Sequence, residues 1–410
     1  MGEVNNPVYL VMVTSDDNHN KYYRMLPNGN DFKVEFGRIG VGGFQTSSYP
    51  MSQWTKKYNE KIKKGYVDQT HLVSDLIVKE KKRKEYIDID NQVIAGIVER
   101  LQSMARQAIK ENYTISSAKV TKKMVDEAQI TLTNLTSADN VELFNKNLIE
   151  LFKIIPRKMS RVSDYLADKN EDFSRIIQKE QDLLDVMKGQ VVQQQIEDTD
   201  IEEDSEVKPI TILDAMGLRI SETNDLDKIK IKSALGSCAD KYYQSWKVEN
   251  IHTQKRFDDF IVNNGNIETK LLWHGSRNEN WWSIINSGLI LKPTNAVITG
   301  SLFGYGIYYA PKAQKSLGYT SLIGSYWTRG NEPFGFMSLY DVAYGKPYDV
   351  YDFSSKFYSF DYNKLQETAK GCHCLHAHAG TNLGGNTLRN DEIIIYREDQ
   401  CTVKYLVELR

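Results

Sequence analysis

The sequence lacks several features that would define its cellular setting. Cysteine occurs four times in 410 residues, at irregular spacing, which argues against a disulfide framework and suits a reducing compartment. No run of about 18 uncharged apolar residues occurs, so we expect no transmembrane helix. The first residues contain no basic segment followed by an apolar one, so we expect no secretion signal. The net charge of -2 gives the whole chain no attraction to nucleic acid.

The N-terminal region is rich in short β-type runs and in positive charge. Three runs of aromatic and β-branched residues, separated by Asn and Gly, predict strands: residues 8–13, 21–25 and 32–36. Residues 52–64 then predict a helix with Trp54 and Tyr58 on its apolar face. Ten Lys or Arg stand against four Asp or Glu from residue 51 to residue 84. The run Lys79–Lys84 is typical of a DNA-contacting or nuclear-import patch, and equally of a solvated linker.

The middle of the chain changes to helical spacing. Apolar residues recur at every third or fourth position from Val93 to Ile109. Further segments with this periodicity are residues 120–134, 140–153, 160–167 and 170–195. Together they predict an all-α bundle of about 100 residues. Seven acids in the ten residues 197–206 predict a solvated linker after the bundle.

Short β-type runs return after the linker, and two of them carry polar groups suited to chemistry. The run 271–273 ends in His274 and Gly275. An imidazole there can bond a ribose hydroxyl, and a glycine lets a planar amide reach the bare backbone. Glu392 opens the apolar run 392–396, where a carboxylate is costly unless it has a partner or a task.

A third segment combines an aromatic run with a short predicted helix. Residues 303–310 include Tyr308, and a helix is predicted over residues 312–320. In that helix Ser316 and Tyr319 would share a face at a spacing of three residues. A hydroxyl and an aromatic ring would then stand together, which suits a flat heteroaromatic amide.

These three segments resemble the catalytic domain of the poly(ADP-ribose) polymerases in order, spacing and flanking residues. The resemblance implies a catalytic triad of His274, Tyr308 and Glu392, with NAD+ as the substrate. In the family, the histidine holds the adenosine ribose. The positions that match NAD+-binding residues are His274, Gly275, Ser276, Asn280, Tyr308, Ala310, Lys315, Ser316 and Tyr319.

The resemblance also implies how the nicotinamide half is held. The Gly275 backbone and the Ser316 hydroxyl would bind the nicotinamide amide, and Tyr319 would stack on its ring opposite Tyr308. Glu392 would bond the ribose 2′-hydroxyl and orient the attacking acceptor. Because loss of nicotinamide leaves positive charge on the ribose, a fixed carboxylate beside it stabilises the transition state.

No metal is required for this step, and we expect none. Segment 372–378 contains zinc-type ligands in Cys372, Cys374, His376 and His378. Strand alternation is expected to separate the cysteines from the later histidines, so a surface loop or strand is favoured. A Rossmann-type dinucleotide site is not indicated, because Gly304-Tyr305-Gly306 lacks the third glycine of its signature.

Two upstream segments resemble other domains of the same family. Phe36-Gly37-Arg38-Ile39-Gly40 resembles the core of the WGR domain, with Phe where Trp is usual. This implies that Phe36, Gly37 and Arg38 contact a broken DNA end. Three stretches resemble the helical regulatory domain: residues 118–122, 151–156 and 182–185. Asp185 matches an acid that faces the adenosine pocket from that domain.

We therefore expect a multidomain α+β protein. The predicted domains are a small β-rich WGR-like DNA-binding domain at 1–85, an all-α helical regulatory domain at 90–196, and a mixed α/β ADP-ribosyltransferase domain with antiparallel sheets at 207–410. Expected partners are broken or nicked DNA and acceptor proteins including the chain itself, with no membrane contact and a monomer in the absence of DNA. The expected location is the nucleus of a eukaryote or the cytoplasm or nucleoid of a bacterium, without secretion.

The favoured function is a DNA-break-activated polymerase of ADP-ribose, and two others stay open. A mono-ADP-ribosyltransferase is indicated by departures from the DNA-dependent members around the acceptor site and the donor-site loop, residues 290–302. These departures are Ile290, Ser301, Leu302 and Ile393 in place of the usual Arg, Tyr, Met and Tyr. The other alternative is a catalytically silent DNA-end-binding protein, against which the complete triad argues.

Overall fold

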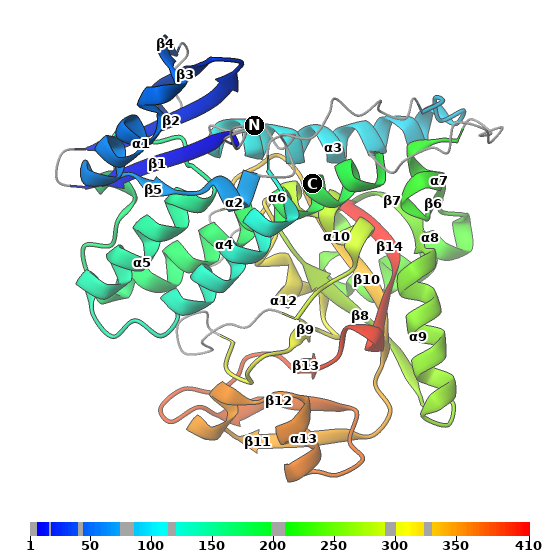
Figure 1. The fold of residues 1–410 in the computed structure, drawn as a ribbon. Helices are drawn as coiled ribbons and strands as arrows, with labels where there is room; N and C mark the ends of the chain where they lie inside the picture. The colour runs from blue at the N-terminus through cyan, green and yellow to red at the C-terminus, as the bar shows by residue number, and fades with distance from the viewer. Residues whose placement is uncertain are drawn as a thin grey trace. The chain divides into compact units, whose positions relative to one another are not determined.

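The computed structural model describes residues 6–15, 18–39, 44–73, 86–113, 120–197, 210–291, 301–323 and 330–410 (Figure 1). Five predicted features lie wholly or partly outside these residues: Lys79–Lys84, Gly40, residues 118–119, the acidic linker after residue 197, and residues 292–300 of the donor-site loop. The fold class is the predicted mixed α+β, with a β-rich N-terminal region, helices, and largely antiparallel sheets.

The chain divides into two compact units, which are described one at a time. The first unit joins Met1–Arg83 to Arg106–Asp198, and the second joins Lys84–Ala105 to Thr199–Arg410. Helix α3 (Gln92–Asn112) contributes residues to both units. The predicted domain limits stay a prediction, because compact packing units need not coincide with domains.

The N-terminal sheet of the first unit has the order β4-β3-β2-β1-β5, with antiparallel neighbours. Its strands are β1 (Val8–Thr14), β2 (His19–Asn28), β3 (Asp31–Arg38), β4 (Gln45–Pro50) and β5 (Val67–Asp68). A two-residue turn joins β2 to β3, where Gly29 adopts a φ of 62° that favours glycine. Helix α1 (Trp54–Lys63) packs the Trp54 ring 5.0 Å from that of Phe32, which confirms the predicted strands and helix.

Helices complete the first unit. They are α2 (Thr70–Val73), α4 (Lys122–Leu135), α5 (Val141–Ile154) and α6 (Phe173–Glu197). Side-chain caps start two of them: Thr121 accepts from the Met124 N–H and Asn140 from the Leu143 N–H. Stacked rings of Phe144 and Phe173, with centroids 3.9 Å apart, pack α5 against α6.

The helix predicted over 160–167 is wrong. Only a 3-10 turn, Ser163–Tyr165, forms within it. Its backbone donors are taken by side chains from distant elements, since Val162 N–H donates to Asn18 Oδ1 and Ala167 N–H to Asn145 Oδ1. Donors bonded in this way cannot join an i→i−4 ladder, so apolar spacing alone misled the prediction.

The second unit contains a five-stranded antiparallel sheet with the order β6-β7-β14-β10-β8. These strands are β6 (Leu218–Glu222), β7 (Tyr242–Asn250), β8 (Thr269–Gly275), β10 (Gly335–Ala343) and β14 (Cys401–Leu409). The helices of this unit outside α3 include α7 (Ile212–Met216), α8 (Asp225–Leu235), α9 (Ile251–Asn263), α10 (Trp281–Ser287), α12 (Ala313–Leu317) and α13 (Tyr362–Thr368). Apolar side chains from α8, α12 and the sheet form one buried core around Trp273 and Met337.

A second sheet has the order β11-β12-β13-β9. Its strands are β9 (Ile307–Tyr309), β11 (Pro347–Asp352), β12 (Cys374–Asn382) and β13 (Glu392–Ile395). β11 and β12 are parallel, and the other neighbours are antiparallel, which is one departure from the antiparallel sheets expected. Figure 1 shows α13 beside β11 and β12.

The helix predicted over 312–320 is shorter than expected. α12 ends at Leu317, with Gly318 as its C-cap. The Tyr319 N–H donates to the Ser316 carbonyl in the turn that follows, so Tyr319 lies beyond the helix. Among the described residues, no helix combines the length and hydropathy needed to span a bilayer.

Candidate active site

The two sheets of the second unit meet where β8 and β9 approach each other. Trp273 and Ala310 exchange two backbone hydrogen bonds, of 2.9 and 3.0 Å. One residue along β8, His274 Nδ1 lies 3.0 Å from the Tyr308 carbonyl oxygen. Because that oxygen can only accept, Nδ1 carries the proton, and Nε2 of the neutral ring is an acceptor. Two predicted triad residues are therefore joined directly.

Only glycine fits at position 275, because α12 approaches the backbone closely there. A Cβ atom built on Gly275 would stand 2.0 Å from the Ser316 carbonyl oxygen, a contact that no side chain can make. Ser316 is buried and donates its hydroxyl proton to the Trp273 carbonyl at 3.1 Å. The Gly275 backbone and the Ser316 side chain therefore lie together, as predicted, and the hydroxyl keeps its lone pairs as acceptors.

Tyr308 is anchored by its hydroxyl. The hydroxyl accepts from the Phe303 N–H at 2.9 Å and donates to the Gly304 carbonyl at 3.1 Å. Burial of the hydroxyl raises the pKa of Tyr308, so the phenol stays neutral. Because the residue as a whole is only half-buried, its ring keeps some exposed surface while its polar end is fixed.

Glu392 opens β13 and forms an ion pair with Lys315 of α12. Both side chains are largely buried, with exposed fractions of 12% and 15%. Burial lowers the pKa of Lys315 to about 7, and the neighbouring carboxylate works against that shift. The strand register puts Glu392 opposite Ala377 and Ile394 opposite Tyr308, so Glu392 and Tyr308 face the same side of the sheet.

Ser276 and Asn280 lie near the end of β8. Asn280 donates to the Ser276 hydroxyl at 3.0 Å, and its Oδ1 is buried without a hydrogen-bond donor among the described residues. Tyr319 is 42% exposed, so part of its side chain is open to a ligand. Ala310 is 1% exposed, and both its backbone groups serve the junction with β8. Any contact of Ala310 with a ligand is therefore limited to its methyl group.

The predicted DNA-contacting residues lie on β3. Phe36 packs against the Tyr23 ring at 5.9 Å, and Gly37 pairs with Tyr22 of β2. Arg38 donates to the backbone carbonyls of Asn18 at 2.9 Å and Ser160 at 3.0 Å. A phosphate contact by Arg38 would compete with these bonds.

Asp185 lies on α6 of the first unit. It accepts a hydrogen bond of 3.0 Å from Gln181, one turn earlier on the helix. Its role toward an adenosine pocket stays a prediction.

The predicted separation of cysteines from histidines on segment 372–378 is wrong. Cys374, His376 and His378 follow one another at intervals of two along β12, and a strand places such residues on one face. Cys374 is buried and donates to the Tyr344 carbonyl, whereas the two imidazoles lie beside Asp349 of β11.

Two features of the site escaped the sequence analysis. Lys315 was expected only as one NAD+-binding position, and the structure shows it as the partner of Glu392. The available signal was the single charge on the otherwise apolar strand β13, because a buried carboxylate favours a partner of opposite charge. The second feature, the approach of Asp349 to the histidines of β12, depends on the register of two parallel strands.

Comparisons with known proteins agree with this arrangement. The poly(ADP-ribose) polymerase catalytic domain family matches residues 230–410, and the WGR domain family matches residues 6–73. A putative poly [ADP-ribose] polymerase-like protein, 100L of Invertebrate iridescent virus 6, is 28% identical over 196 residues. This match covers 47% of the chain and 97% of the viral protein. The uncharacterized protein 101L of the same virus is 33% identical over 186 residues, which cover 44% of the chain and 76% of that protein.

A cellular relative matches over a shorter stretch. Poly [ADP-ribose] polymerase 2 of Homo sapiens is 29% identical over 158 residues, covering 34% of the chain and 26% of the human protein. The two family matches fall on the N-terminal sheet and on the sheets that carry His274, Tyr308 and Glu392. The chain therefore belongs to the poly(ADP-ribose) polymerase family, with a WGR domain and a catalytic domain, and is an NAD+-dependent ADP-ribosyltransferase.

Proposed function

We propose that this chain is a DNA-break-activated poly(ADP-ribose) polymerase that modifies itself and other proteins. The observation that carries the proposal is the charged pair Lys315–Glu392 on the same face of the sheet as Tyr308. A carboxylate in this position serves both transfer and elongation, because it can bind a ribose hydroxyl and orient an acceptor hydroxyl toward the anomeric carbon.

In this proposal, NAD+ binds across the junction of β8 and β9. Nε2 of His274 accepts from an adenosine ribose hydroxyl, since Nδ1 is held by the Tyr308 carbonyl. The nicotinamide amide bonds the Gly275 backbone and donates to the Ser316 hydroxyl oxygen. The exposed ring of Tyr319 stacks on the nicotinamide, which accounts for an aromatic side chain left 42% exposed.

Glu392 and Lys315 act on the charge that develops during the reaction. Breakage of the bond from ribose to nicotinamide leaves an oxocarbenium-like ribose, and a nearby carboxylate lowers the energy of that state. A protonated Lys315 offsets part of the carboxylate field, and a neutral Lys315 does not. With its pKa lowered to about 7, Lys315 changes charge near neutral pH and so tunes the site.

We assign DNA recognition to the WGR domain. Helix α1 carries exposed Lys56 and Lys63, and exposed Lys64 follows as its C-cap. Lys61 lies 4.2 Å from the centroid of the Tyr23 ring. These cations suit phosphate contacts, which depend on charge and not on base sequence. In the proposal, α6 with Asp185 restrains the catalytic domain until DNA binding shifts the population of restrained molecules.

Labelled NAD+ tests the proposal directly. The full chain is incubated with no DNA, with intact circular DNA, or with the same circle after nicking, and products are separated on denaturing gels. We expect a ladder or smear of labelled protein that is strongest with nicked DNA. Equal labelling in all three reactions would contradict DNA activation, and absence of label in all three would contradict transfer.

DNA binding by α1 has a separate test. Lys56→Gln should lower the slope of log affinity against log salt by about 0.9, the value for one lost phosphate contact. Lys230→Gln on α8 removes an exposed charge from the catalytic domain and serves as the control. If both variants keep the original slope, Lys56 makes no phosphate contact.

A mono-ADP-ribosyltransferase is the second candidate. Ile393, which follows Glu392, is buried with 2% exposure and lacks the hydroxyl of the usual Tyr. Leu302, which packs against an apolar core, lacks the flexible thioether of the usual Met. A single shifted band in place of a ladder, at every NAD+ concentration, would favour this candidate.

A further inference from the structure

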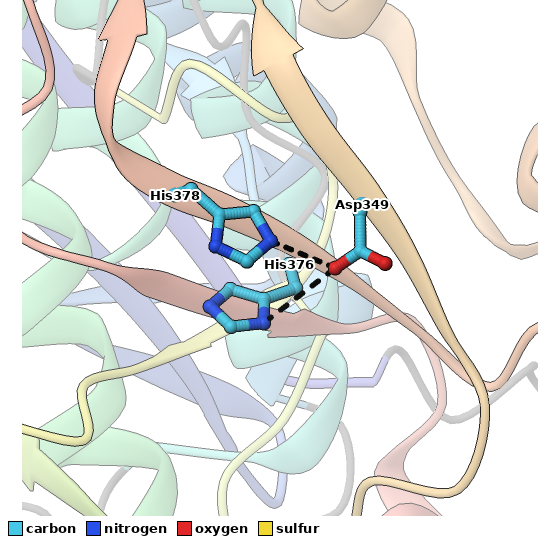
Figure 2. A group of neighbouring side chains, drawn as sticks. All are labelled: Asp349, His376 and His378. Atoms are coloured by element: carbon cyan, nitrogen blue, oxygen red, sulfur yellow. Dashed lines mark hydrogen bonds and ion pairs between the residues drawn. The ribbon is translucent and has the colours of Figure 1, made fainter.

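Three side chains with metal-binding atoms meet on the strand pair β11–β12 (Figure 2). Asp349 comes from β11, and His376 and His378 come from β12. Asp349 Oδ1 lies 2.7 Å from His378 Nε2 and 3.8 Å from His376 Nδ1. The three atoms all lie within 4.8 Å of one another. They lie close together although the aspartate and the first histidine are 27 positions apart in the sequence.

The strand register explains why these residues converge. In the parallel pair, Asp349 stands opposite His376. His378 follows two positions later and therefore projects from the same face. The rings are further ordered by stacking: His376 on His378 at 3.8 Å, and Tyr351 on His378 at 4.4 Å. Ordered ligands lose little side-chain freedom on binding an ion, which favours affinity.

A second carboxylate completes the arrangement. His376 Nε2, on the far side of the ring from Asp349, lies 3.4 Å from Asp391 Oδ2. Asp391 is itself held by the Ala379 N–H at 2.7 Å. A histidine that binds a metal through one ring nitrogen usually gives the other to a carboxylate, which orients the ring. The Asp391 carboxylate is placed for this role, but at 3.4 Å it makes no hydrogen bond with His376 Nε2, which is buried without a hydrogen-bond partner among the described residues.

We propose that Asp349, His376 and His378 bind one zinc-type divalent ion. Two imidazole nitrogens and one carboxylate oxygen are ligands that Zn2+ accepts, at about 2.0–2.2 Å from the ion. Tetrahedral ligands at these lengths stand about 3.3 Å apart, and the contacts of 2.7 and 3.8 Å lie on either side of that value. Binding through His376 Nδ1 also requires the Tyr344 hydroxyl, which lies 2.9 Å from that nitrogen, to give up its hydrogen bond. Asp349 is 45% exposed, so water can reach the fourth position.

The ion would lie outside the transfer site. Ala377 pairs with Glu392, whereas His376 pairs with Ile393, so the imidazole and the catalytic carboxylate point to opposite faces of the sheet. The ion would instead cross-link β11 to β12 and fix Asp391, the residue before Glu392. In this proposal the ion takes no part in the transfer step and stabilises the sheet that carries Glu392.

Metal binding by the full chain tests this proposal without any measure of activity. Protein stripped with a chelator is titrated with Zn2+ in competition with a chromophoric chelator, and separately with Co2+, whose visible spectrum reports geometry and ligands. We expect one equivalent of ion and a Co2+ spectrum without thiolate charge transfer. His378→Ala and Asp349→Asn should each weaken binding at least about tenfold, and Asp391→Asn about tenfold through His376.

Two control variants separate this site from general effects of charge or histidine content. Asp352→Asn removes a neighbouring acid of β11, and His252→Ala removes an exposed histidine of α9; both should bind the ion as the unmodified chain does. Zn2+ should also raise the melting temperature of the unmodified chain and not that of His378→Ala.

Three results would overturn the proposal. These are no uptake of Zn2+ or Co2+ at micromolar concentration, unchanged affinity in the His378 and Asp349 variants, or a thiolate band that assigns the ion to buried cysteines. Each is independent of ADP-ribose transfer, so failure here leaves the proposed function standing.

Discussion

Glu392→Gln removes one negative charge from the site and keeps the shape of the side chain. At roughly 4 Å and an effective dielectric constant near 20, a carboxylate stabilises a unit positive charge by about 4 kcal/mol. Lys315 offsets part of that field when it is protonated. We therefore expect the loss to raise the activation free energy by about 3–4 kcal/mol, which is a fall in kcat of roughly 10²- to 10³-fold.

The variant should still fold. Removing one partner of a buried ion pair commonly costs about 3–5 kcal/mol, because a charge is left unpaired. Lys315 avoids most of this cost, since burial lowers its pKa to about 7 and the lone amine is neutral at pH 8. The kinetic comparison is therefore made at pH 8, with the melting temperature of each protein measured alongside.

Release of nicotinamide at varied NAD+ concentration gives kcat and KM for the unmodified chain and the variant. A fall in kcat with little change in KM is the expected pattern, because the carboxylate acts mainly on the transition state. Glu249→Gln on β7 makes the same change at an exposed pair with Arg219 and should be silent. A fall of less than tenfold for Glu392→Gln, or an equal fall for the control, would refute the reasoning.

Four further predictions concern the pH response, the packing at Gly275 and a buried ion pair. Burial lowers the pKa of Lys315 from 10.5 to about 7, so kcat should rise with pH through about 7, and Lys315→Met should flatten that step. The folding cost of the buried ammonium is present below pH 7 and lost between about 7 and 10.5, so stability relative to Lys315→Met should rise across that window in urea titrations. Gly275→Ala would press a methyl group against the Ser316 carbonyl oxygen, and should cost about 1–3 kcal/mol in denaturant unfolding and abolish NAD+ binding in calorimetry. Glu180→Gln breaks a pair with Arg157 in which both side chains are at most 5% exposed, and should lower the free energy of unfolding by about 3–5 kcal/mol.

The predictions for Gly275 and Glu180 each have a control variant within the chain. Gly96→Ala in α3 meets no atom within 4 Å and should stabilise the helix by up to about 1 kcal/mol, whereas equal losses at both glycines would contradict the packing argument. Asp126→Asn breaks an exposed pair with Lys122 on α4 and should change stability by less than about 0.5 kcal/mol. If Glu180→Gln changes the free energy of unfolding as little as its control does, the Arg157 side chain is better solvated in the folded protein than its burial indicates. A pH profile that is identical with and without Lys315 would remove the charge-tuning role.

Local signals in the sequence were sufficient for much of the fold. The strands at 8–13 and 32–36 and the helix at 52–64 were predicted because their apolar spacing and turn residues act within a few positions. The prediction failed at 160–167, where apolar spacing was right for a helix but Asn18 and Asn145 captured the backbone donors. No pattern in that segment indicates hydrogen-bond acceptors that lie more than 20 residues away in the sequence.

The candidate site also combines features that the sequence could predict with features that it could not. His274 and Gly275 could be recognised because a strand end followed by glycine is a local pattern, and the structure adds its reason, the Ser316 carbonyl at 2.0 Å from a Cβ. The sequence could not predict which ring nitrogen of His274 carries the proton, because that depends on the Tyr308 carbonyl in the neighbouring sheet. The carbonyl partners of Arg38 could not be predicted either, because they are distant from it in the sequence.

The sequence by itself determined the family and the order of the motifs that contain His274, Tyr308 and Glu392, because each motif consists of adjacent residues. Only the tertiary structure decided which charges meet. Lys315 pairs with Glu392, which lies 77 positions later in the sequence. Asp349 lies beside two histidines because of the register of a parallel strand pair. Such contacts depend on how strands pair and helices pack, and pairing is a property of the folded chain as a whole.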